Sequence, residues 1–251
     1  MTDVDEATDT SGGRRRRRKE QRAGKKPMPL WLESVVLLGI ALALAVLIKA
    51  LFLQAFYIPS PSMEPQFVED DRILVQKVSY WGSGEPQRGD IIVFKDPGGW
   101  LDPVDTAGAT GPVSGVLERI GLYPTGGHLV KRVMAVGGDH IVCCDDDGRI
   151  TVNGDPLDES AYLPPGTDPS DVTFDKTVPD GYLWMMGDNR AFSFDSRGHM
   201  GGPGGGFVKE DLVVGKVFAL VWPWGRAELI DRPEVFDGVP DPQGGSQEGS
   251  G

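Results

Sequence analysis

The stretch LWLESVVLLGIALALAVLIKALFLQAFYI occupies residues 30–58 and decides how the rest of the chain is organised. Between Ser34 and Ile48 it contains no charged residue, and apolar side chains would lie on all sides of a helix. About 20 apolar residues are enough to cross the hydrocarbon core of a bilayer. The stretch therefore predicts a transmembrane anchor helix, which we place at residues 29–56. The alternatives are a buried core helix and a cleaved signal peptide, but the A-x-A pattern at residues 41–43 is followed by more apolar chain.

The segment before the anchor is basic, whereas the chain as a whole is acidic. The 251 residues carry a net charge of −12, yet residues 1–29 hold nine Lys and Arg against five Asp and Glu. The positive-inside rule then predicts a cytoplasmic N-terminus and an extracytoplasmic position for the chain after Tyr57. Residues 1–28 show no apolar periodicity and are predicted to form a disordered basic cytoplasmic tail. The acidic balance of the remaining chain argues against nucleic acid as a partner.

Beyond the anchor, short runs rich in Val and Ile alternate with Gly, Pro, Asp and Asn, a pattern typical of antiparallel strands joined by turns. A long Gly- and Pro-rich stretch at residues 97–127 includes one short predicted helix at residues 113–120. The fold class predicted is mostly β, with a single N-terminal transmembrane helix followed by an extracytoplasmic antiparallel β domain. The predicted strands are Arg72–Val78, Asp90–Phe94, Leu129–Val136, His140–Cys144, Ile150–Val152, Tyr182–Met186 and Leu212–Val221.

The sequence offers little for metal or disulfide chemistry. The three histidines have no helical metal-binding spacing, and the acidic turn at residues 145–148 lacks the end ligands of a calcium loop. Cys143 and Cys144 are neighbours, and adjacent thiols close a disulfide only through a strained ring. We therefore predict no metal, no cofactor and a free thiol pair, with a vicinal disulfide as the open alternative.

The first candidate for chemistry follows the anchor directly. Prolines at positions 59, 61 and 65 fix the backbone torsion φ and restrict the residues before them. This predicts that Ser60 and Ser62 are held on stiff, extended backbone. The alternative is that the segment is only a rigid rim between anchor and domain.

A lysine on a predicted strand and a polar loop are the other two candidates. In the strand at residues 129–136, Lys131 shares a face with Val133 and Ala135, so its amine would be partly buried. Burial penalises the charged form and lowers the pKa of the amine, which makes it a usable general base. Residues 186–198 form a dense polar loop after the strand predicted at residues 182–186. A lysine that reaches from an edge strand to solvent and a well-bonded surface loop are the ordinary structural explanations.

Together, in this order and behind one anchor, these segments resemble the type I signal peptidases of bacteria, the Ser/Lys dyad leader peptidases of peptidase family S26. The resemblance covers about residues 30–224, and four boxes in order make it specific. The boxes are Pro61-Ser62-Met63-Glu64-Pro65, Arg88-Gly89-Asp90-Ile91-Ile92-Val93-Phe94, Val130-Lys131-Arg132-Val133 with Gly138-Asp139, and Gly187-Asp188-Asn189-Arg190 through Ser193, Asp195, Ser196 and Arg197.

The resemblance implies a membrane-bound serine endopeptidase that removes signal peptides from exported precursor proteins through an acyl-enzyme. Ser62 would be the nucleophile and Lys131 the general base, and the Ser62 N–H and the Ser60 hydroxyl would form the oxyanion hole. The implied supporting residues are Ser193, which would orient the lysine, Asp195 with Arg197, which would brace the last loop, and Asp188, which would pair with Arg132.

The resemblance also implies a domain layout and partners. A catalytic β core would occupy residues 57–140 and 178–224, with a smaller inserted β domain at residues 141–177. The composition of residues 225–251 predicts a disordered C-terminal tail. The partners would be exported precursors, the lipid bilayer and the secretion translocon, at the plasma membrane. The alternatives are another membrane-tethered Ser/Lys protease and a membrane-anchored β-rich binding or scaffold protein without catalysis.

Overall fold

The computed structural model describes residues 29–80, 82, 84–101 and 127–242. The basic tail at residues 1–28 and the predicted helix at residues 113–120 lie outside the described residues. The chain divides at residue 43 into two compact units. The first holds most of a single apolar helix and the second is a mostly β domain, which confirms the predicted fold class.

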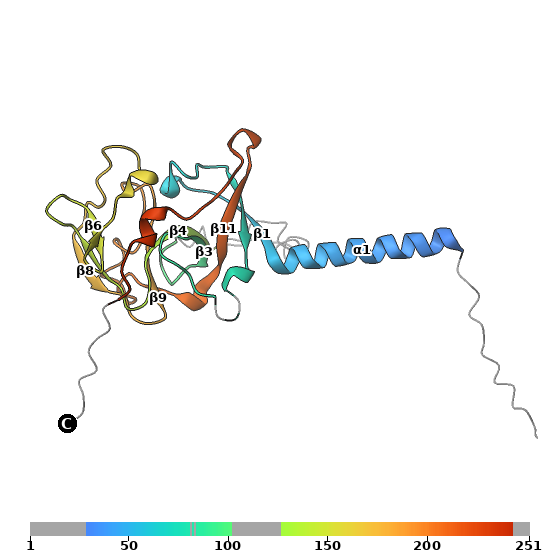
Figure 1. Cartoon of the computed structure of the whole chain (residues 1–251), viewed down its shortest axis with the longest axis horizontal. Coiled ribbons are helices and arrows are strands. Elements are labelled where there is room, and N and C mark those ends of the chain that lie inside the picture. The colour runs from blue at the N-terminus through green and yellow to red at the C-terminus, as the bar shows by residue number, and fades with distance from the viewer. Residues whose placement is uncertain (1–28, 81, 83, 102–126, 243–251) are drawn as a thin grey trace, which may run out of the picture. The chain divides into compact units, whose positions relative to one another are not determined.

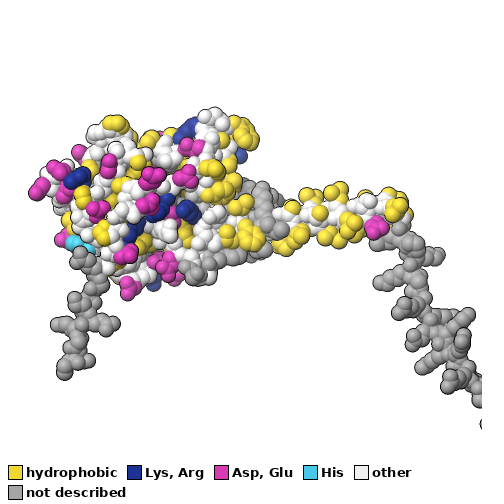
Figure 2. All heavy atoms as spheres, in the orientation of Figure 1, with side chains coloured by type: hydrophobic (Ala, Val, Ile, Leu, Met, Phe, Trp, Pro, Cys, Tyr) yellow, Lys and Arg dark blue, Asp and Glu magenta, His cyan; other side chains and the backbone are white. Residues whose placement is uncertain are grey.

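Helix α1 (Leu30–Phe52) carries apolar side chains all around its axis. Figure 2 shows mostly hydrophobic side chains along the face of α1 that is turned to the viewer. Its 18-residue stretch Leu30–Leu47 is long and apolar enough to cross a membrane and is not buried. The prediction of a helix up to residue 56 is wrong, because α1 ends at Phe52. The next residues form strand β1 (Leu53–Tyr57), in which every second side chain is buried, and they pair with β2.

The β domain is built on an eight-stranded antiparallel sheet with the order β1-β2-β11-β3-β4-β9-β10, and β12 pairs with β11. Figure 1 labels β1, β11, β3, β4 and β9 of this sheet. The predicted strands in this sheet appear with ends shifted by at most two residues. Strand β4 lies between β3 and β9, inside the sheet. The strands after β1 are β2 (Arg72–Gln76), β3 (Ile91–Lys95), β4 (His128–Ala135), β9 (Tyr182–Met186), β10 (Val208–Lys209), β11 (Val213–Trp222) and β12 (Glu228–Leu229).

A second, four-stranded antiparallel sheet has the order β7-β6-β5-β8. Its strands fall between residues 140 and 177, and we call this part of the chain the inserted region. The two sheets share one hydrophobic cluster, in which Met134 and Trp184 of the large sheet pack with Ile141 and Ile150 of the small one. The strands are β5 (His140–Cys143), β6 (Ile150–Val152), β7 (Asp155–Pro156) and β8 (Phe174–Thr177).

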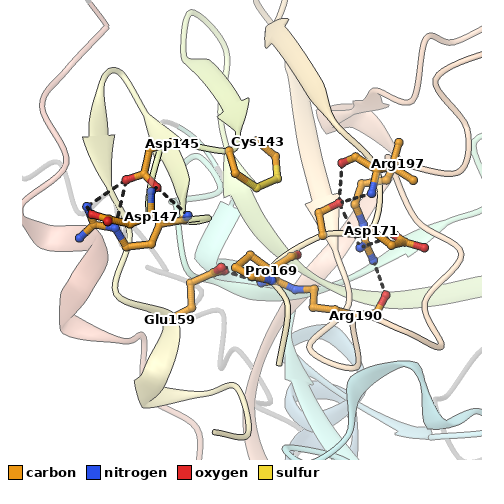
Figure 3. Close-up of a disulfide and its surroundings, with 12 residues drawn as sticks. Cys143, Asp145, Asp147, Glu159, Pro169, Asp171, Arg190 and Arg197 are labelled. Atoms are coloured by element: carbon orange, nitrogen blue, oxygen red, sulfur yellow. Dashed lines mark hydrogen bonds and ion pairs between the residues drawn. A yellow bond between two sulfur atoms is a disulfide. The ribbon is translucent and has the colours of Figure 1, made fainter. Parts of the chain in front are cut away.

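Cys143 and Cys144 form a disulfide at the end of β5, so the expectation of free thiols is wrong (Figure 3). That expectation rested on the strain of the ring that adjacent cysteines close. The vicinal disulfide was the open alternative, and it is the one that the structure contains. Cys143 is buried in the cluster that the two sheets share.

The prediction of disorder from residue 225 onward is wrong for residues 225–242. This segment, which we call the C-terminal strap, forms β12 and a 3₁₀ turn at Glu234–Asp237. The side chain of Phe236 is buried in the shared cluster. The composition is rich in Pro and Gly, but a few apolar side chains are enough to fix an extended segment on a core.

Candidate active site

Ser62 lies in a 3₁₀ turn formed by Pro61–Met63, so the prediction of extended backbone is wrong at this position. Proline is well tolerated in the first turn of a helix, because the N–H that it lacks would have no partner there. Ser60, which precedes the turn, is extended as predicted, with φ −141° and ψ 154°. Met63 and Phe67 are buried in the core and fix the turn. Because the N–H groups that open a helical turn have no acceptor within it, that of Ser62 points out of the turn.

The structure brings Lys131 of β4 to Ser62, although the two residues are 69 positions apart in the chain. The lysine Nζ lies 2.5 Å from the Ser62 Oγ, within hydrogen-bond distance. The Ser60 Oγ is 3.2 Å from the Ser62 Oγ. Three polar side chains singled out from the sequence therefore meet at one point.

Lys131 is only 4% exposed, and its strand lies inside the sheet between β3 and β9. Burial lowers the pKa of the Lys131 amine to about 8, while the charges of Asp195 and Asp188 oppose this shift. A lysine with this pKa is neutral in about one molecule in ten at pH 7 and in about half at pH 8, and its lone pair can then accept a proton.

The polar loop after β9 holds the backbone of the Ser62 turn. The Asn189 N–H donates to the Ser62 carbonyl at 3.1 Å, and the Asn189 side-chain amide donates to the Pro61 carbonyl at 3.0 Å. A Cβ at Gly187 would meet the Ser62 carbonyl oxygen far inside contact distance, so only glycine fits at that position. Sequence reasoning gave no individual role to Asn189 or Gly187, although both stand in the last box.

Two buried ion pairs brace this loop. Arg132 donates to Asp188 through Nε at 2.8 Å and through Nη2 at 2.7 Å. Arg197 donates to Asp195 through two nitrogens at 2.9 Å each. Burial would raise the pKa of Asp195, but the bonds and charge of Arg197 hold it below its usual value. Asp195 is therefore a charged partner of the buried Arg197.

Ser193 does not bond Lys131 directly in the part of the chain that the structure describes. Its Oγ is buried and contributes, with Arg197, to holding the pKa of Asp195 below its usual value. The side chain lies instead against Gly187, where an added Cβ would collide with the Ser193 Oγ.

A third buried ion pair was missed from the sequence. Arg190, in the polar loop, donates to both carboxylate oxygens of Glu159, at 3.1 and 2.5 Å (Figure 3). Glu159 belongs to the inserted region and stands in a stretch without regular periodicity, so no local pattern marks it. In the sequence Glu159 is marked only by its charge. The burial of Glu159 is visible only in the structure.

A groove of about 810 Å³ opens beside these residues. One wall comes from Glu64 and Pro65, which follow the Ser62 turn, and a second comes from Asn189 and its neighbours. The inserted region supplies a further wall through residues 164–171. Among the described residues, no group of three or more His, Cys, Asp or Glu side chains is placed to hold a metal ion.

Residues 31–222 match the family model described as "Signal peptidase, peptidase S26". The chain belongs to the signal peptidase family. A "Probable signal peptidase I" from Mycobacterium leprae (strain TN) is 38% identical over 244 residues, which cover 84% of this chain and 83% of the relative. A "Signal peptidase I" from Mycobacterium tuberculosis is 38% identical over 226 residues, covering 79% and 76% of the two chains.

The signal peptidase family is also represented among similar solved structures. A signal peptidase I from Enterococcus faecalis is 24% identical and covers 53% of this chain and 96% of its own, with a TM-score of 0.34. Family membership rests on the match over residues 31–222 and on the curated relatives. The family resemblance of the four sequence boxes is thereby confirmed.

Proposed function

We propose that this member of the signal peptidase family is a membrane-anchored serine endopeptidase that removes signal peptides from exported precursor proteins with a Ser62/Lys131 dyad. The observation that carries the proposal is the 2.5 Å contact between the Lys131 Nζ and the Ser62 Oγ, made by a buried lysine whose pKa is lowered to about 8. A serine hydroxyl is a weak nucleophile until an adjacent base removes its proton.

The reaction would proceed in two stages. The neutral Lys131 amine takes the Ser62 hydroxyl proton while the Oγ attacks the scissile carbonyl carbon, which gives a tetrahedral intermediate. The lysine ammonium then gives that proton to the leaving amine, the peptide bond breaks, and an ester with Ser62 remains. In the second stage the neutral lysine takes a proton from water while the water oxygen attacks the ester carbon. The lysine ammonium then returns that proton to the Ser62 Oγ as the bond to the acyl group breaks, and the carboxylic acid product leaves.

The oxyanion of the intermediate needs donors, and we assign this role to the Ser62 N–H and the Ser60 hydroxyl. The Ser60 Oγ lies 3.2 Å from the nucleophile, within reach of an oxygen bonded to the attacked carbon. Each such donor contributes about 3–4 kcal/mol to transition-state stabilisation. The Arg132–Asp188 and Arg197–Asp195 pairs would hold the dyad in place. Ser193, whose buried hydroxyl lies beside Gly187, stays a candidate for orienting the amine during turnover.

Helix α1 would anchor the enzyme in the plasma membrane with its N-terminus in the cytoplasm. Ser62 follows the end of α1 at Phe52 by about ten residues, so the dyad would stand close to the outer membrane surface. A signal peptide held in the bilayer beside the secretion translocon would present its cleavage site at the same level. The catalytic domain would therefore be extracytoplasmic.

Cleavage of a model precursor by the purified full chain in detergent tests this function. The resemblance implies a preference for small side chains before the cut, so a precursor ending its signal peptide in Ala-x-Ala is expected to be cleaved after the second Ala. Mass spectrometry of the new N-terminus locates the cut. A matched precursor with Phe in place of the second Ala should stay intact. The scaffold alternative gives no product from either precursor.

The rate of cleavage is expected to rise with pH. The pKa of Lys131 is lowered to about 8, so the amine is protonated below that value and neutral above it. A base catalyst works only in its neutral form, so kcat should increase about tenfold per pH unit in the acidic range and level off above about pH 9. Circular dichroism at each pH shows that the fold persists. A flat profile would exclude a lysine base.

A further inference from the structure

The two ion pairs that brace the last loop belong to a larger buried charge cluster that includes the inserted region. Its members contribute three guanidinium groups and three carboxylates, so the positive and negative charges balance. Each of them is at most 6% exposed. The members of the buried charge cluster are Arg132, Arg190, Arg197, Glu159, Asp188 and Asp195.

Glu159 connects the inserted region to the Ser62 side of the dyad. Its carboxylate accepts two bonds from Arg190, whose Nε also donates to the Gly187 carbonyl at 3.0 Å. Gly187 and Asn189 are the residues that contact the Ser62 carbonyl. The position of the Ser62 turn therefore depends on an arginine that the inserted region holds.

Glu159 also connects to the Lys131 side of the dyad. The Tyr162 hydroxyl donates to Glu159 at 2.6 Å, and burial together with the Glu159 charge keeps the pKa of Tyr162 well above its usual value. The Arg132 guanidinium lies over the Tyr162 ring, 4.3 Å from its centroid. Arg132 follows Lys131 directly on β4. The Tyr162 ring therefore supports the side chain of the residue next to Lys131.

We propose that Glu159 is a positioning residue for the dyad, through Arg190 on the nucleophile side and through Tyr162 and Arg132 on the lysine side. This role rests on the proposed function. Removal of the Glu159 charge leaves the buried Arg190 guanidinium without a balancing carboxylate. The loop that carries Gly187 and Asn189 then loses one of its three buried ion pairs, and small displacements of reacting groups strongly reduce the rate of an enzyme.

The inserted region thus acts as a part of the active-site scaffold. Glu159 opens a 3₁₀ turn, Glu159–Ala161, that is capped by the Asp158 side chain. Figure 3 shows Glu159 and Arg190 pointing toward each other from the inserted region and the polar loop. Asp158→Ala is a matched control for a Glu159 variant, because the Asp158 side chain supports the same turn by accepting from the Ser160 N–H.

Glu159→Gln and Tyr162→Phe in the full chain test the proposal by steady-state cleavage of the Ala-x-Ala precursor. We expect Glu159→Gln to lower kcat about 10- to 100-fold with KM changed less than about twofold, since only the geometry of the dyad is affected. Tyr162→Phe keeps the ring under Arg132 and loses one bond, so its effect should be smaller. The midpoint of the pH profile should stay in place, because Glu159 is not among the charges that shift Lys131.

Hydrogen exchange of the loop at residues 187–192 gives a readout that does not need activity. Glu159→Gln should speed exchange there, whereas Asp158→Ala should lower the melting temperature and leave both kcat and loop exchange as in the parent. The proposal is overturned if Glu159→Gln leaves kcat and loop exchange unchanged, or if Asp158→Ala changes them as much. A parent that cleaves no precursor refutes the proposed function, while the exchange comparison still decides whether Glu159 positions the loop.

Discussion

Replacing Ser62 by Ala is expected to abolish precursor cleavage, with kcat/KM lowered by about 10⁴-fold or more. The substitution removes the oxygen that forms the acyl-enzyme and leaves the surrounding turn unchanged. Ser60 cannot substitute for it, because in the structure the Lys131 Nζ contacts the Ser62 Oγ. Product formation from an Ala-x-Ala precursor, followed by gel and mass spectrometry, measures the loss.

The same variant should keep its fold. The alanine side chain cannot form the hydrogen bond to the buried amine, and this loss costs about 1–3 kcal/mol of the free energy of unfolding. Near-UV circular dichroism and the melting temperature check this. Ser34→Ala is the matched control, since the Ser34 hydroxyl bonds the Leu30 carbonyl within α1. If Ser62→Ala cleaves the precursor at the parent rate, Ser62 is not the nucleophile and the Ser62/Lys131 dyad is wrong.

The anchor and most strands could be predicted because their signals are local. The apolar length of α1 is visible in the sequence, and β4 and β9 appear where Val-, Leu- and Met-rich runs stand between turn residues. The boundary of the anchor could not be predicted in the same way. Leu53–Tyr57 continues the apolar run of the helix before it, and only its pairing with β2 makes it a strand.

The C-terminal strap and the disulfide also could not be predicted from local sequence signals. Few apolar residues separate the prolines and glycines of residues 225–242, so composition alone predicts disorder. Phe236 becomes ordered because the shared cluster supplies the contacts, and those contacts come from distant parts of the chain. Cys143 is likewise buried among residues of both sheets. Tertiary packing overrides local composition at each of these positions.

Local sequence signals likewise predict some features of the candidate site and not others. Strand alternation places Lys131 on the face of Val133 and Ala135, and that face is buried, with Lys131 4% exposed. Arg132 on the opposite face is buried as well, which alternation does not predict. Its contact with Ser62 spans 69 positions and could be expected only from the family resemblance. Neither strand alternation nor the family resemblance marks Glu159. Its partner Arg190 lies 31 positions away, and the stretch around Glu159 has no regular period. Buried ion pairs between separate segments are decided by the fold, and no local pattern marks them.

Replacing Lys131 by Met should remove cleavage while making the protein more stable. The thioether has no basic lone pair of comparable strength, so kcat/KM should fall by about 10³-fold or more at every pH. Met has nearly the length of lysine and fills the same buried space, so the site does not collapse. Cleavage assays from about pH 6 to 10 measure the first effect, and loss of the pH-dependent rise should accompany it.

The gain in stability follows from the lowered pKa of Lys131. In the unfolded chain the amine has its ordinary pKa of 10.5, and folding lowers that value to about 8. The unfolded state therefore binds more protons between these values, so the lysine destabilises the fold fully below about pH 8 and this cost disappears toward pH 10.5. A shift of this size corresponds to about 3 kcal/mol, from which the lost hydrogen bond to Ser62 must be subtracted.

Thermal unfolding of the full chain in detergent around pH 7 should thus give a higher melting temperature for Lys131→Met than for the parent, and the difference should shrink as the pH approaches about 10. Lys77→Met is the matched control, because burial also lowers the pKa of Lys77, which lies outside the candidate site. That control should cleave the precursor at the parent rate. A Lys131→Met protein that is less stable than the parent around pH 7 would mean that the amine is hydrated in the folded state, and a hydrated lysine would be protonated and unable to activate Ser62.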